Sequence, residues 1–106
     1  MISEEMVRED LNELRYYYQR RYLIDKYIEE HNLPSSIVDL EKLYADAIRK
    51  APIIFYHAYV GLYVKGWTQD DVAAEMGFNI KYVQALNIKL IKFLQENISK
   101  EEVECS

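Results

Sequence analysis

The chain has 106 residues, with 18 acidic side chains, 13 basic side chains and a formal net charge of −5. This length fits one domain, and a hydrophobic content of 50% is too high for a disordered chain. Only 3 glycines and 2 prolines are present, which excludes collagen-like architectures and disfavours a β-sandwich with its frequent turns.

The first predicted helix runs from Ser3 to about His31, because this stretch lacks Gly and Pro and its apolar residues recur three or four residues apart. Asn32 and Pro34 then favour a helix end. Two neighbouring apolar stripes consist of Val7, Leu11, Leu14, Tyr18 and Tyr22, and of Tyr17, Ile24, Tyr27 and Ile28. The C-terminal half of this helix is therefore expected to be apolar over a wide arc.

A second helix begins after a cap at Ser35 or Ser36. Its buried face is expected to consist of Ile37, Leu40, Leu43, Tyr44 and Ala47. A third helix, from about Ile53 to Lys65, is apolar on most sides and ends at Gly66. A helix with this pattern is expected in the middle of a bundle.

Two further helices follow. Thr68 and Asp71 predict a capping box for a short fourth helix that Gly77 ends. Asn79 caps a fifth helix that runs to about Ile98. The whole pattern predicts an all-α fold of about five helices in a single compact domain.

Three segments are expected within this domain. Residues 1–50 form a helical support or interaction segment, and residues 51–98 form a helix-turn-helix unit. Residues 99–106 form an acidic tail without an apolar pattern, which we expect to fray.

The stretch of residues 66–86 meets the demands of two short helices that cross through a tight turn. Ala73 supplies a small residue at the crossing point, and Gly77 supplies the positive φ of the turn. Six apolar side chains are expected to face the core: Val72, Met76, Phe78, Ile80, Val83 and Leu86.

These residues resemble the helix-turn-helix of bacterial and phage transcription regulators. The string Thr68-Gln69-x-x-Val72-Ala73-x-x-Met76-Gly77 is similar to that of phage-repressor-type domains. The wider arrangement, over roughly residues 37–96, resembles the fourth region of bacterial sigma factors. The resemblance implies double-stranded DNA as a partner, and RNA polymerase as a possible second one.

In such domains the second helix of the unit enters the major groove and its early residues reach base edges. By position these residues are Asn79, Lys81, Tyr82, Gln84 and Ala85, followed by Ile88 and Lys89. Gln84 suits adenine, and Lys81 suits guanine or phosphate. Thr68 and Gln69 begin the other helix, whose N–H groups suit a phosphate.

The net charge at first disfavours nucleic acid, because contact with phosphate needs positive charge. From Phe78 to Gln95, however, the chain holds three lysines and no acid. Three acidic residues of the preceding helix, Asp70, Asp71 and Glu75, would repel DNA if they faced it. DNA binding is therefore expected to be weak per monomer, and a homodimer is expected to strengthen it.

Four tyrosines, Tyr16, Tyr17, Tyr18 and Tyr22, alternate with arginines near the middle of the first helix. They could form an aromatic and basic surface for nucleic acid. Packing in the core or at a subunit interface is the preferred interpretation, because three consecutive tyrosines cannot all face one core.

The remaining features favour a cytoplasmic protein without a cofactor, a metal or enzymatic activity. The longest apolar stretch, Ile53 to Val64, is shorter than the about 20 residues that cross a membrane. The N-terminus has no secretory pattern, and Cys105 is the single cysteine. No glycine-rich phosphate loop or Gly-x-Ser-x-Gly motif is present.

A DNA-binding transcription regulator is therefore the first hypothesis. The second is a helix-turn-helix interaction module that binds RNA polymerase or another regulator without contacting DNA. A third is a phage accessory protein of DNA packaging or replication.

Overall fold

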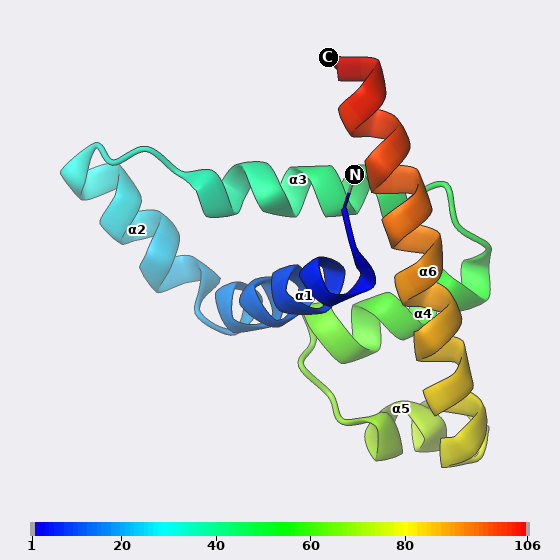
Figure 1. Cartoon of the computed structure of the whole chain (residues 1–106). Coiled ribbons are helices and arrows are strands. Elements are labelled where there is room, and N and C mark those ends of the chain that lie inside the picture. Colours follow the sequence, from blue (N-terminus) through cyan, green and yellow to red (C-terminus); the bar gives the residue numbers. More distant parts are fainter. Residues whose placement is uncertain (1, 106) are drawn as a thin grey trace.

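The structure is a computed structural model that describes the backbone of residues 2–105 and the side chains of residues 2–98. The elements are α1 (Glu4–Gln19), α2 (Arg21–His31), α3 (Ser36–Ile48), α4 (Ile53–Tyr59), the π-helical segment η1 (Val60–Val64), α5 (Gln69–Met76) and α6 (Ile80–Cys105). No strand occurs in residues 2–105, which confirms the predicted all-α class (Figure 1). None of the described helices combines the length and the apolar character needed to cross a membrane.

The core forms around one face of α6. Leu90, Ile91, Leu94 and Ile98 on this face are fully buried. Helices α1, α3, α4 and α5 all contact α6, and α5 lies beside its N-terminal end (Figure 1). The apolar residues of α6 recur three or four positions apart, so burying them places the opposite face of the helix in solvent.

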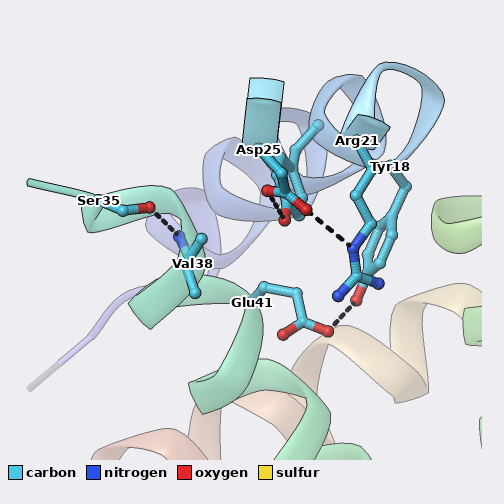
Figure 2. A network of polar contacts seen from close by, with 7 residues as sticks. Tyr18, Arg21, Asp25, Ser35, Val38 and Glu41 are labelled. Carbon is cyan, nitrogen blue, oxygen red and sulfur yellow. Dashed lines mark hydrogen bonds and ion pairs between the residues drawn. The ribbon is translucent and has the colours of Figure 1, made fainter. Parts of the chain in front are cut away.

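Tyrosine hydroxyls tie the helices together at the edges of this core. The Tyr44 hydroxyl donates to the Asp10 carboxylate at 2.7 Å. The Tyr18 hydroxyl donates to the Glu41 carboxylate at 2.7 Å, as Figure 2 shows. Both bonds join α1 to α3. A tyrosine can bury its ring and still satisfy its hydroxyl at the core boundary, and these bonds fix how α1 lies against α3.

The prediction of a single helix from Ser3 to His31 is wrong. The chain bends at Arg20, where φ is −127° and ψ is 18°, and this bend divides the segment into α1 and α2. Beyond the bend, α2 projects away from the other helices and buries none of its residues (Figure 1). Tyr22, expected in the apolar stripe, is 76% exposed. The Tyr17 hydroxyl donates to Asp25 across the bend at 2.7 Å. This bond between residues eight positions apart helps to hold a bend that no Gly or Pro marks in the sequence.

The last helix also differs from the prediction. Helix α6 continues to Cys105 instead of ending near Ile98, so the backbone is helical where a frayed tail was expected. The added residues contain no Gly or Pro and are rich in Glu, which favours helix. The side chains of residues 99–106, including the thiol of Cys105, lie outside the described residues.

Two substitutions on α6 test the assignment of its buried face. Leu90→Ala is expected to lower the free energy of unfolding by about 2–5 kcal/mol, because the side chain is fully buried. Ile88→Ala, at a position that is 47% exposed, is expected to stay within about 0.5 kcal/mol of the parent. Urea unfolding followed by circular dichroism measures both. Equal losses would show that the face is misassigned.

Candidate nucleic-acid interface

Both helices of the α5–α6 unit begin with the predicted caps. The Thr68 hydroxyl accepts from the Asp71 backbone N–H at 3.1 Å, and the Thr68 N–H donates to the Asp71 carboxylate at 3.1 Å. The Asn79 side-chain oxygen accepts from the Tyr82 N–H at 2.9 Å. Side-chain caps of this kind satisfy N–H groups that have no partner within the helix. They define where the two helices start.

The turn between the helices depends on Gly77, whose φ is +74°. A Cβ added there would meet no heavy atom within 4 Å, so there is room for a side chain. Glycine is favoured at this position because of the positive φ alone. The N–H groups of Gly77 and Phe78 both donate to the Ala73 carbonyl. These bonds close the end of α5 immediately before α6 begins.

The packing of α5 onto the preceding helix depends on Gly61, which sequence reasoning did not single out. A Cβ on Gly61 would lie 2.9 Å from the Val72 Cγ2 atom and 3.4 Å from a ring atom of Trp67. In the same segment the Lys65 N–H donates to the Val60 carbonyl at 2.8 Å, the spacing of a π-helix. A glycine inside an apolar helix was the only signal of this close approach.

The predicted contact residues of α6 share one solvent-facing surface, which we call the reading face. Its exposed members are Lys81, Tyr82, Gln84, Ala85, Ile88 and Lys89. Between them along the helix, Val83, Leu86 and Leu90 turn into the core. Asn79 and Thr68 are also exposed, and Gln69 is half-buried at the start of α5.

Phe78 corrects one prediction, because it does not face the core. Its side chain is 38% exposed, and its ring lies 4.5 Å from the ring of Tyr82, centroid to centroid. The left-handed conformation at Gly77 ends α5 as predicted, and the Phe78 ring then packs against Tyr82 in the first turn of α6. An aromatic pair therefore stands at the N-terminal end of the reading face.

A groove of about 510 Å³ is bordered by α1, η1, the start of α5 and the N-terminal half of α6. Arg8, Asn12 and Arg15 of α1 line one side, and the first residues of α5, Thr68 and Gln69 among them, line another. The Arg15 guanidinium donates to the Gly66 carbonyl at 2.9 Å. The α1 residues were missed, because they lie far away in the sequence and only the fold brings them to the predicted site.

The charges of Arg8 and Arg15 reach the Tyr63 phenol, which also lines the groove. Burial raises the pKa of the Tyr63 phenol at the groove, while the charges of Arg8 and Arg15 lower it in part. The Tyr63 hydroxyl donates to Asn87 of α6 at 2.6 Å. Both guanidinium groups therefore act on the same small region.

The three acidic residues of α5 are divided between two hollows. Asp70 lines the groove with the arginines. Asp71 is engaged in the capping box, and it lines a separate hollow together with Glu75 and Trp67. Of the three acidic side chains, Asp70 is the one that lines the groove.

The four tyrosines of the N-terminal segment do not form one surface. Tyr17 is buried and Tyr18 is half-buried, and burial raises the pKa of both. Tyr16 and Tyr22 are exposed, and the guanidinium carbon of Arg20 lies 3.9 Å from the ring centre of Tyr16. Of the proposed interface residues, only Tyr16 and Tyr22 present most of their side chains to solvent.

Comparison of the chain with protein-family models, with curated proteins and with solved structures gives no match.

Gly61→Ala tests how α5 is held against η1. The added methyl group is expected to lower the free energy of unfolding by about 1–3 kcal/mol, because it meets the buried Val72 side chain. In a Val72→Ala background, Gly61→Ala should lower the free energy of unfolding much less, because the nearest clashing atom, Val72 Cγ2, has been removed. A double-mutant cycle by urea unfolding measures this coupling. Equal costs of Gly61→Ala in the two backgrounds would contradict the proposed close contact.

Proposed function

We propose that this protein is a DNA-binding transcription regulator of the helix-turn-helix kind, similar to sigma-factor region 4, that reads the major groove with α6. The single observation that carries this proposal is the reading face. Its polar side chains lie on the first turns of a helix whose opposite face is buried, so they are held outward on a rigid element. A helix presented in this way fits the major groove.

The side chains of this face supply chemistry that suits DNA. Gln84 can form a paired hydrogen bond with adenine, and Lys81 can reach guanine or a phosphate. Lys81, Lys89 and the nearby Lys92 are exposed, and none forms an ion pair with a described residue. Their charges are therefore available to an external anion.

The regulator would work in the cytoplasm of a bacterium or of a phage-infected cell, without enzymatic activity. A homodimer would double the phosphate contacts and read two half-sites. RNA polymerase is a second proposed partner, since the sigma-like arrangement serves recruitment to promoters.

The competing proposal is an interaction module that never contacts DNA. Two observations favour it: the net charge of −5, and α2, which buries none of its residues and exposes Tyr22, Leu23 and Tyr27. An accessory role in phage DNA packaging or replication is a further alternative, because such proteins use the same kind of unit.

Salt dependence of binding distinguishes DNA binding from the interaction module. Affinity for genomic-fragment DNA is expected to fall at least about 40-fold between about 50 and 200 mM salt, if the three lysines of α6 each neutralise one phosphate. Fluorescence anisotropy with labelled fragments measures the affinity. A folded sample that binds no DNA at the lower salt concentration would eliminate DNA binding and leave the interaction module.

The double variant Lys81→Ala with Gln84→Ala tests the reading role of α6. It should lose sequence preference, with each lost base contact costing about 1–3 kcal/mol of discrimination. Lys42→Ala, at an exposed position of α3, is the matched control and should leave the preference unchanged. Selection from a random DNA library measures the preference. An unchanged preference in the double variant would show that the reading helix is misassigned.

A further inference from the structure

We propose that α1 is part of the DNA interface and that Arg8 and Arg15 bind backbone phosphates in the groove between α1 and the start of α5. This inference rests on the proposed DNA binding. It changes the extent of the interface, because residues 1–50 would then contact DNA directly and would not only support the unit that does.

The arrangement of the groove residues on α1 carries the first step. Arg8, Asn12 and Arg15 are spaced four and three residues apart, which places them on one face of the helix, and all three line the groove. Two cations and an amide are therefore aligned along one wall. Asp70 is the acidic residue on the opposite side, so the balance of charge lining the groove is positive.

The two arginines differ in how they are held. Arg15 donates to the Gly66 carbonyl at 2.9 Å, which uses part of its donor capacity and positions the guanidinium beside the loop before α5. A guanidinium has five N–H donors, so others are left for a ligand. Arg8 is exposed and forms no ion pair with a described residue. Its charge is free to neutralise a phosphate.

The start of α5, whose residues Gln69 and Asp70 line the same groove, supplies a second set of donors. The N–H groups of Gln69 and Asp70 lie in the first helical turn, where no acceptor exists within the helix. The N–H of Asp71 is already occupied by the Thr68 hydroxyl. A phosphate in the groove would therefore meet guanidinium groups on one side and backbone N–H groups on the other.

The position of the groove identifies the source of the phosphate. Asn87 and Ile91 of α6 line it, and Asn87 lies beside Ile88 and one turn beyond Gln84 of the reading face. In a helix-turn-helix complex the DNA backbone flanks the helix that occupies the major groove, and phosphate contacts set its register. A strand passing the reading face would therefore cross the groove.

The salt dependence of binding gives this inference a quantitative test. Three lysines and two arginines would neutralise five phosphates, so affinity should fall about 500-fold between about 50 and 200 mM salt. In the Arg8→Gln variant the fall in affinity over the same salt range should be about 150-fold. In the double variant Arg8→Gln with Arg15→Gln it should be about 40-fold. Sequence preference should stay unchanged, because phosphate contacts carry no sequence information. Arg8→Lys keeps the positive charge and should therefore retain most of the parental salt dependence of DNA binding.

The controls separate this inference from the proposed function. Lys42→Gln removes one positive charge from α3, which lies across the molecule from α5 in Figure 1, and should retain the parental salt dependence. If the parent binds DNA and Arg8→Gln has the same salt dependence as Lys42→Gln, the phosphate contact is overturned while DNA binding stands. If the folded parent binds no DNA, the proposed function itself fails.

Two further experimental results also have a defined interpretation. If Arg15→Gln unfolds the protein, because the bond to Gly66 is lost, the single variant Arg8→Gln carries the test alone. The parent could also bind inorganic phosphate without DNA, lose that binding in Arg8→Gln and keep an unchanged DNA salt dependence. That result would assign the groove to a free anion and overturn the backbone contact.

Discussion

The burial of one face of α6 is the constraint on which the rest of the structure depends. Leu90, Ile91 and Leu94 are fully buried there, and α1, α3, α4 and α5 all pack against this helix. Burying a side chain of this size contributes about 1.5–3 kcal/mol, so rotation of α6 about its axis would expose a large part of the core. The same packing fixes which side chains the N-terminal turns of α6 present to solvent. Stability and the candidate function are thus linked through one helix.

Tyrosine hydroxyls add direction to this packing. Apolar contact is non-directional, but the bonds from Tyr44 to Asp10, from Tyr18 to Glu41 and from Tyr63 to Asn87 join specific positions on different helices. The first two orient α1 against α3, and the third orients η1 against α6. Through α1, they also place the arginines that line the groove. The high tyrosine content is in this way connected to the geometry of the candidate interface.

The net charge of −5 says little about the candidate interface, because the charges are unevenly distributed in space. The reading face carries lysines without acids, and the groove beside it holds two arginines from α1 and one acid, Asp70, from α5. Asp71 and Glu75 of α5 line a separate hollow and do not line this groove. Association with an anionic partner depends on this local field more than on the total charge.

The sequence by itself determined the features that depend on a few neighbouring residues. The caps at Thr68 and Asn79, the turn at Gly77 and the spacing of the reading face follow from local hydrogen bonding, backbone preference and helical periodicity. The tertiary structure alone decided the bend at Arg20, the exposure of Phe78, and the approach of Arg8 and Arg15 to α5. The approach of the arginines to α5 arises from contacts between residues far apart along the chain, such as Arg15 and Gly66. The bend and the exposure of Phe78 involve nearer pairs, Tyr17 with Asp25 and Phe78 with Tyr82, which the apolar periodicity of the sequence does not reveal.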